Sequence, residues 1–259
     1  LTSAALPFVP LKGLVLSQLL YGDPTRRGSV DIDLAIPPEL RRRTIDVLGS
    51  AGHHHQRRQY TEGTVEAFHC LRHGTLLELH FTISTAERFG GLFGELFGET
   101  EKISLDGEEL RVPRTEVLLA YLLVHFARHL ASQRALWVED LRRLLELKRD
   151  TMPWDAFLAL AATHRLANAL YVAITIVDDI FAEYRLGVAF PAFVREGIDS
   201  LRSHHGKLLY GYLLPRLLSA GRSPMLHRLH SFGMSERWQD RAALVGAFVR
   251  RRLVSGERS

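Results

Sequence analysis

Two aspartates that stand two residues apart are the first candidates for chemistry in this sequence. Asp31 and Asp33 lie in RRGSVDIDLAIPPELRRR, residues 26–43, where polar and apolar residues alternate as in a β-strand. Because successive side chains of a strand point to opposite faces, both aspartates share one face, and the other face carries four apolar residues: Val30, Ile32, Leu34 and Ile36. Neighbouring carboxylates repel each other unless water screens them or a cation lies between them. The pair therefore predicts a hydrated polar face or a cation site, and leaves both open.

A third acid follows in a second stretch with strand alternation. In LLELHFTIS, residues 76–84, Glu78 and His80 share the face opposite the apolar side chains. If this strand lies beside the first, with both apolar faces turned to the core, Glu78 joins Asp31 and Asp33. The three acids then form a candidate catalytic and metal-binding set.

Three converging carboxylates suit a hard divalent cation. Mg²⁺ (or Mn²⁺) binds oxygen ligands, and substrate phosphates usually complete its coordination. Two such ions about 3.5–4 Å apart can activate an attacking oxygen and stabilise a leaving one. Without an ion the carboxylates repel each other. The sequence therefore predicts that Asp33→Asn leaves the unliganded protein as stable as before, or more stable by up to about 1 kcal/mol.

The elements that must position these acids form an N-terminal α+β part. The expected helices cover residues 11–20 and 37–52, and the expected strands cover residues 30–36, 64–72, 76–84 and both arms of a hairpin over 103–112. Asp106-Gly107 is the expected turn of that hairpin. The histidine run within HHHQRRQYTEG, residues 53–63, predicts a floppy loop rather than a zinc site, and the glycine- and phenylalanine-rich residues 87–100 stay unassigned.

After Pro113 the apolar spacing becomes helical. Helical patterns cover residues 115–131, 135–150, 153–181, 191–203, 207–220 and 235–254. The expected fold class is α+β, with a small mixed or antiparallel nucleotidyltransferase-type sheet flanked by helices and a C-terminal helical domain. The expected domains are residues 1–113 and 114–259.

The order of these motifs resembles a known family. LKG, a loop with an arginine, DIDLAI, a helix and a strand with a third acid resemble the DNA polymerase β-type nucleotidyltransferases. More narrowly, they resemble a poorly characterised bacterial group with the pattern LKG…R…GDIDLLV…ELH, over roughly residues 10–145. The resemblance implies a bacterial enzyme that moves a nucleoside monophosphate (NMP) group from a nucleoside triphosphate (NTP) to an acceptor hydroxyl.

The resemblance also assigns roles. Asp31 and Asp33 would ligate the metals, and Glu78 would ligate a second metal or deprotonate the acceptor. The implied nucleotide-binding residues are Lys12, Gly13, Ser17 and Arg27.

Two departures from the family pattern keep alternatives open. Leu14 follows Gly13, where the superfamily usually has serine, and Ser29 and Val30 separate Gly28 from Asp31. The alternatives are a protein that binds an NTP or a partner without turnover, and phosphoryl transfer from the same site. The acceptor stays open between a peptide natural product, a small molecule, a protein and a tRNA end, with a preference for a peptide or small molecule.

Several other residues could serve function or structure. His80 orients the acid, contacts substrate or is a buried structural residue. His125 and His129 lie four residues apart on one helical face, which favours packing over a role toward the nucleotide or acceptor. Asp140 is expected on a helix surface. The stripe of Phe89, Phe93 and Phe97 is expected in the core.

Composition narrows the classes of partner. Among the 259 residues, 33 Lys and Arg against 29 Asp and Glu give a net charge of +4, which suits a phosphate ligand but argues against duplex nucleic acid. No apolar run approaches the about 20 residues of a membrane span, and the first ten residues lack the features of a signal peptide. The lone Cys70, expected to be buried, suits a reducing cytoplasm.

Overall fold

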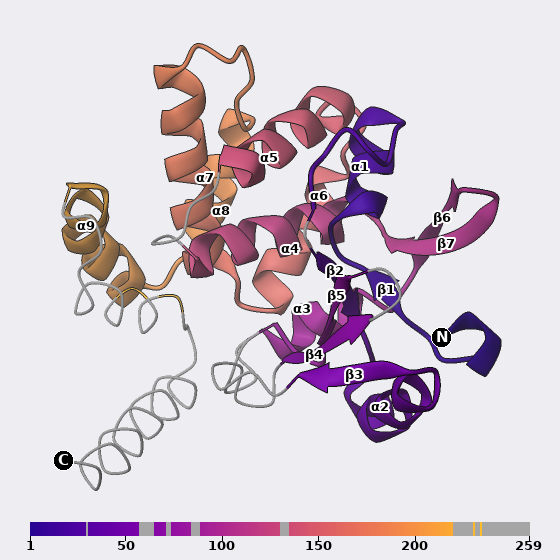
Figure 1. Cartoon of the computed structure of the whole chain (residues 1–259). Helices are drawn as coiled ribbons and strands as arrows, with labels where there is room; N and C mark the ends of the chain where they lie inside the picture. Colours follow the sequence, from indigo (N-terminus) through magenta and orange to yellow (C-terminus); the bar gives the residue numbers. More distant parts are fainter. Residues whose placement is uncertain are drawn as a thin grey trace, which may run out of the picture. The chain divides into compact units, whose positions relative to one another are not determined.

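A computed structural model describes most of the chain, namely residues 1–29, 31–56, 65–70, 74–83, 89–129, 135–219, 230 and 234. The described residues form two compact units, the first up to Leu118 and the second from Leu119 (Figure 1). The first unit holds the strands, and the second is helical. The α+β class with a sheet, flanking helices and a following helical part is confirmed.

The first unit is built on a mixed five-stranded sheet. Its strands are β1 (Val9–Pro10), β2 (Asp31–Ala35), β3 (His53–Gln56), β4 (Val65–Cys70) and β5 (Thr75–His80), in the order β1-β2-β5-β4-β3. β2 and β5 run parallel, and the other neighbouring pairs run antiparallel. The expected hairpin of residues 64–72 and 76–84 is confirmed as β4 and β5.

Helical segments and a second, two-stranded sheet complete this unit. They are η1 (Thr2–Ala4), α1 (Leu14–Tyr21), η2 (Pro38–Leu40), α2 (Arg41–Ser50), α3 (Gly90–Glu95), β6 (Thr100–Leu105) and β7 (Glu108–Pro113). Asp106 and Gly107 between β6 and β7 have φ values of 51° and 84°, as a two-residue hairpin turn with positive φ at both positions requires. The expected turn is confirmed. Phe89 and Phe93, beside and within α3, are buried as expected, whereas Phe97, after the end of α3, is only half-buried.

The apolar face of the sheet packs against α2. Leu34, Leu79 and Phe81 form one buried cluster with Leu48 of α2. Alternation therefore predicted the core face correctly. Ile32 differs, because it lies at the start of β2 and is 36% exposed. Val30 lies outside the described residues.

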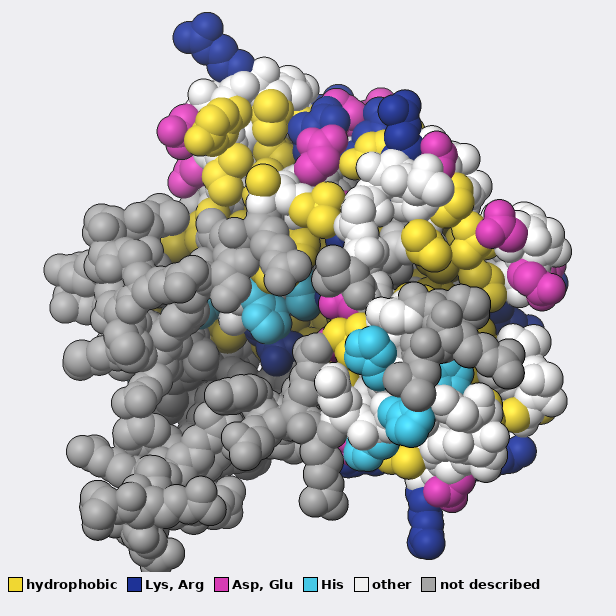
Figure 2. All heavy atoms as spheres, in the orientation of Figure 1, with side chains coloured by type: hydrophobic (Ala, Val, Ile, Leu, Met, Phe, Trp, Pro, Cys, Tyr) yellow, Lys and Arg dark blue, Asp and Glu magenta, His cyan; other side chains and the backbone are white. Residues whose placement is uncertain are grey.

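The histidine run is a strand and not a loop. β3 pairs with β4, which places His54 opposite His69 and His55 opposite Phe68. The expected floppy loop is wrong because cross-strand contacts outweigh the polar local sequence: the His55 ring lies 4.9 Å from the Phe68 ring, and its Nε2 lies 2.6 Å from Glu66 Oε2. Figure 1 shows α2 alongside β3, and Figure 2 shows several histidine side chains grouped on the surface of this unit.

The second unit contains the remaining described helices. They are α4 (Thr115–Arg128, whose first turn belongs to the first unit), α5 (Ala135–Lys148), α6 (Trp154–Thr163), α7 (Ala167–Glu183), α8 (Ala192–Leu201) and α9 (His204–Ser219). The continuous helical pattern over 153–181 is in fact two helices, because Arg165 adopts a left-handed φ of 54° between them. The expected helix near the C-terminus and the Cys70 side chain lie outside the described residues. Among the described helices, none has the length and hydropathy to cross a bilayer.

Candidate active site

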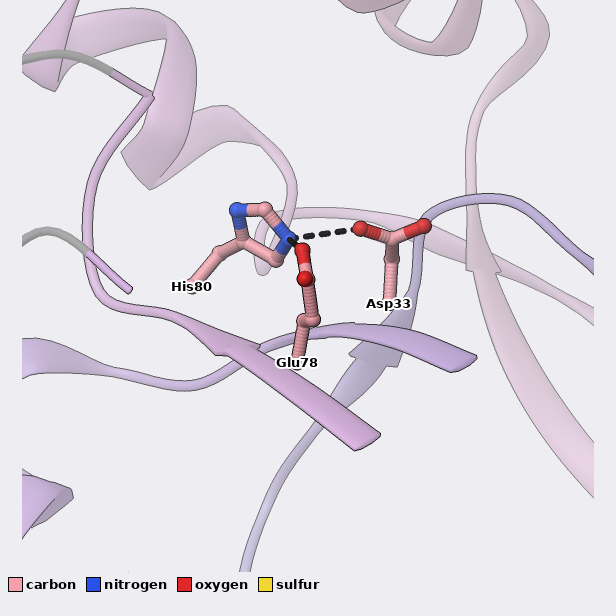
Figure 3. A group of neighbouring side chains, drawn as sticks. All are labelled: Asp33, Glu78 and His80. Carbon is pink, nitrogen blue, oxygen red and sulfur yellow. Dashed lines mark hydrogen bonds and ion pairs between the residues drawn. The ribbon is translucent and has the colours of Figure 1, made fainter. Parts of the chain in front are cut away.

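The register between β2 and β5 brings two of the expected acids together. Asp33 lies directly opposite Glu78, on the face of the sheet away from α2. His80 follows two residues later on the same face of β5. Single ligand atoms of Asp33, Glu78 and His80 all lie within 4.8 Å of one another, and Figure 3 shows the three side chains converging. We call these three residues the acidic centre.

Asp33 is the most constrained member of the acidic centre. It is 2% exposed, its Oδ1 lies 2.7 Å from His80 Nε2, and its Oδ2 lies 3.2 Å from Lys12 Nζ. Burial raises the pKa of Asp33, but the hydrogen bond with His80 and the charge of Lys12 outweigh it and lower that pKa from 3.8 to about 2. The carboxylate is therefore ionised at neutral pH, with a positive partner beside it.

Local backbone geometry places Lys12 at Asp33. The Leu11 N–H donates to the Asp33 carbonyl oxygen at 3.0 Å, which extends the pairing of β1 with β2. Gly13 then turns the chain into α1 with a φ of 71°. A Cβ on Gly13 would lie 3.3 Å from Ser29 Oγ and 3.4 Å from the Asp31 carbonyl oxygen, so glycine suits both the torsion and the close approach.

Ser17 and Arg27 organise the loop between α1 and β2. Ser17 is fully buried, its hydroxyl donates to the Asp23 carbonyl oxygen at 2.7 Å, and it accepts from the Arg27 N–H at 3.0 Å. Arg27 itself is 5% exposed. The structure thus gives Ser17 a loop-holding contact, and direct contact of either residue with a nucleotide stays a prediction.

Asp31 lies two residues before Asp33 on the same face of β2, outside the acidic centre. Among the described residues, the group of mutually close ligand atoms contains His80 and not Asp31. Asp31 stands opposite Leu76, and its carbonyl oxygen accepts from Ser29 Oγ at 2.7 Å. Its role as a metal ligand stays a prediction. Sequence reasoning placed His80 on the correct face but did not count it in the metal-binding set.

Comparison with known proteins identifies the family. Residues 1–182 match the family described as "Uncharacterised nucleotidyltransferase". The chain belongs to this nucleotidyltransferase family. No curated protein matches it.

Two solved structures resemble the nucleotidyltransferase weakly. The antibiotic-resistance factor ANT(2'')-Ia, solved in solution, is 15% identical with a TM-score of 0.44, over 63% of this chain and 84% of that one. A crystallised antigenic nucleotidyltransferase-like protein from Paracoccidioides brasiliensis is 18% identical with a TM-score of 0.39, over 65% and 86%. Similarity at this level indicates no substrate.

Another carboxylate of the sheet, Glu66, lies on the face opposite the acidic centre and has structural partners. Glu66 of β4 forms an ion pair with Arg41 of α2, and His55 approaches its other oxygen. The Arg41 guanidinium also lies 5.3 Å from the centre of the Phe81 ring. Burial opposes these contacts, which nevertheless lower the pKa of Glu66. Glu66 therefore fastens α2 to the sheet.

His125 of α4, and His129 just after the end of that helix, belong to an aromatic cluster in the second unit. The His125 ring lies 4.7 Å from His129 and 4.8 Å from Trp137. These ring contacts agree with the packing role that the sequence favoured, and the alternative contact with nucleotide or acceptor stays untested. Asp140 of α5 is 1% exposed, so its expected place on the helix surface is wrong. It shares the buried face of α5 with leucines, which its charge concealed.

Proposed function

We propose that this chain is a cytoplasmic bacterial nucleotidyltransferase that uses a divalent cation to move an NMP group from an NTP to an acceptor hydroxyl. Membership of the family supports the transfer reaction. The observation that carries the metal dependence is the acidic centre, in which a buried, ionised Asp33 stands opposite Glu78. The lone cysteine supports the reducing compartment.

The donor set fits Mg²⁺ or Mn²⁺. Asp33 and Glu78 would hold the ion, with Asp31 on the same face of β2 completing the ligands when nucleotide is present. The bound ion would neutralise charge on the α-phosphate and on the departing pyrophosphate. In this structure Lys12 Nζ and His80 Nε2 each contact one Asp33 oxygen, and a bound cation would take the place of such a partner.

The chain's own residues would do the remaining work. Lys12 would leave Asp33 for the triphosphate, and the backbone turn at Gly13, which is buried in this structure, would lie against the phosphates with Arg27 and the loop that Ser17 holds. As the alternative to holding the ion, Glu78 would accept the proton of the acceptor hydroxyl. The acceptor oxygen forms a bond to the α-phosphorus while the bond to pyrophosphate breaks. Positioning and charge neutralisation supply most of the acceleration.

The proposed catalytic residues all precede Pro113. We therefore assign the reaction to residues 1–113 and leave residues 114–259 as the helical domain. The preferred acceptor is a peptide or small molecule, ahead of a protein or a tRNA end, because the family resemblance implies such a substrate. The small net charge of +4 argues against duplex nucleic acid as a partner.

Label transfer tests this function. The protein is incubated with Mg²⁺, an extract of the source organism and an NTP labelled at either the α- or the γ-phosphate. We expect the α-label alone to reach an acceptor, Glu78→Gln to abolish the transfer, and Glu66→Gln, on the opposite face, to retain it. Transfer of the γ-label would instead show phosphoryl transfer. NTP binding with no label transferred would show a protein that binds without turnover.

A further inference from the structure

The third group of the acidic centre is an imidazole where the family resemblance implied a carboxylate. We propose that His80 is itself a metal ligand, through Nε2, and that it makes the site prefer Mn²⁺ over Mg²⁺. This inference rests on the proposed function, because it assigns the cation of that same site.

The distances fit coordination of one ion. His80 Nε2 lies 2.7 Å from Asp33 Oδ1 and 4.0 Å from Glu78 Oε2. Metal–ligand bonds of about 2.1 Å place adjacent ligand atoms about 3.0 Å apart and opposite ones about 4.2 Å apart. The two His80 separations are close to these values, and the ligand atoms of Asp33 and Glu78 lie within 4.8 Å of each other.

The imidazole is held on a rigid element and faces the acids. The Ile36 N–H donates to the His80 carbonyl oxygen at 2.9 Å, which fixes the backbone at the end of β5. The His80 side chain is 16% exposed, and Figure 3 shows its Nε2 edge turned toward both carboxylates with the other ring nitrogen turned away. On this face, the strand neighbours of His80 are Ala35 and Val65, and those of Glu78 are Asp33 and Ala67.

Ligand chemistry then selects the ion. Mg²⁺ takes oxygen ligands almost exclusively, whereas imidazole favours transition metals. Two carboxylates with one imidazole therefore suit Mn²⁺, which accepts both kinds of donor, better than Mg²⁺. Nitrogen coordination requires the Nε2 lone pair, so the ring proton would lie on Nδ1.

A different role would produce the same geometry without the metal. His80 could act as a positioning residue that only donates a hydrogen bond to Asp33. His80→Gln separates the two roles, because a glutamine amide can still donate near the position of Nε2 but offers no imidazole nitrogen. His69→Gln is the matched control, since His69 of β4 lies on the same face of the sheet but opposite Leu76, outside the acidic centre.

The test is pulsed electron paramagnetic resonance of Mn²⁺ bound with a nonhydrolysable NTP. We expect an imidazole ¹⁴N coupling in the wild type and in His69→Gln, and its loss in His80→Gln. Titration should show Mn²⁺ affinity falling by about tenfold or more in His80→Gln, with a smaller change for Mg²⁺. His80→Asp, which restores an oxygen ligand, should bind Mn²⁺ without the coupling and shift the preference toward Mg²⁺.

The outcomes separate this inference from the proposed function. The wild type could bind Mn²⁺ without a ¹⁴N coupling while Asp33→Asn and Glu78→Gln weaken Mn²⁺ binding. That result would overturn the role of His80 and leave the proposed function standing. A coupling that persists in His80→Gln would also overturn it. Failure of the wild type to bind Mn²⁺ with or without nucleotide would overturn both. Melting curves of each variant in EDTA identify one that has not folded, and His80→Asp then provides the second measurement.

Discussion

Asp33→Asn tests how the acidic centre is balanced without a metal. The substitution keeps the shape of the side chain and removes one negative charge. Crowded carboxylates alone predict that the unliganded protein becomes no less stable. The structure reverses that expectation, because Lys12 and His80 both contact the ionised Asp33 carboxylate. Removing the charge leaves a largely buried Lys12 ammonium without its anion.

The pKa of Asp33 sets the magnitude. A fall from 3.8 to about 2 means that the folded protein favours the ionised carboxylate by about 2 kcal/mol. Asparagine resembles the protonated acid, so we expect Asp33→Asn to lose about 2 kcal/mol at pH 7, or roughly 5 °C in Tm. Because the folded-state pKa is depressed, this stability is present above about pH 4 and is lost as the pH falls toward 2. The difference between wild type and variant should shrink over that window.

Thermal unfolding in EDTA, followed by circular dichroism, measures the effect. Asp46→Asn in the exposed part of α2 is the control and should change stability by less than about 0.5 kcal/mol. Asp33→Asn should also lose most of the rise in Tm that Mg²⁺ with an NTP gives the wild type. If Asp33→Asn melts at or above the wild type in EDTA, repulsion with Glu78 exceeds the contacts to Lys12 and His80, and the reasoning is refuted.

Three further substitutions probe the surroundings of the acidic centre. Lys12→Gln should weaken NTP binding, yet raise the affinity for Mn²⁺ alone by about tenfold because the substitution removes a competing cation. Calorimetric titration measures both affinities, and a fall in Mn²⁺ affinity would contradict the prediction. Ser17→Ala leaves the buried Arg27 N–H and the partly buried Asp23 carbonyl without the hydroxyl, so it should lower the free energy of unfolding in urea by about 1–3 kcal/mol and raise KM for the NTP. Unchanged values would remove its loop-holding role. Glu66→Gln should lower the free energy of unfolding, most clearly near neutral pH where the depressed pKa of Glu66 keeps it ionised, and should leave the affinity for Mn²⁺ unchanged. Glu78→Gln should lower the affinity for Mn²⁺ without lowering the free energy of unfolding. If both variants change both quantities alike, the assignment of the two acids to opposite faces is contradicted.

Alternation along the strands was enough to predict most of the acidic centre. Asp33, Glu78 and His80 each follow or precede a core residue by one position, so their common face could be read from the sequence. The hairpin turn at Asp106-Gly107 could also be predicted, because the two residues of such a turn determine its backbone geometry locally.

What the sequence could not supply depends on contacts between distant segments. Lys12 reaches Asp33 only because β1 pairs alongside β2 and the pairing continues to Leu11. The strand at His53–Gln56 forms only because β4 lies beside it. The burial of Asp140 depends on which helix face meets its neighbours, and a charged residue gives no such signal. The break at Arg165 rests on one left-handed residue within an otherwise apolar helical pattern.

Anomalous diffraction from crystals grown with Mn²⁺ and a nonhydrolysable NTP tests the central claim most directly. The account requires a manganese peak within coordination distance of Asp33 and Glu78, with the triphosphate completing the ligands and Lys12 moved from Asp33 to a phosphate oxygen. A well-bound nucleotide with manganese elsewhere, or with Asp33 still paired to Lys12 and no metal beside it, would contradict the account.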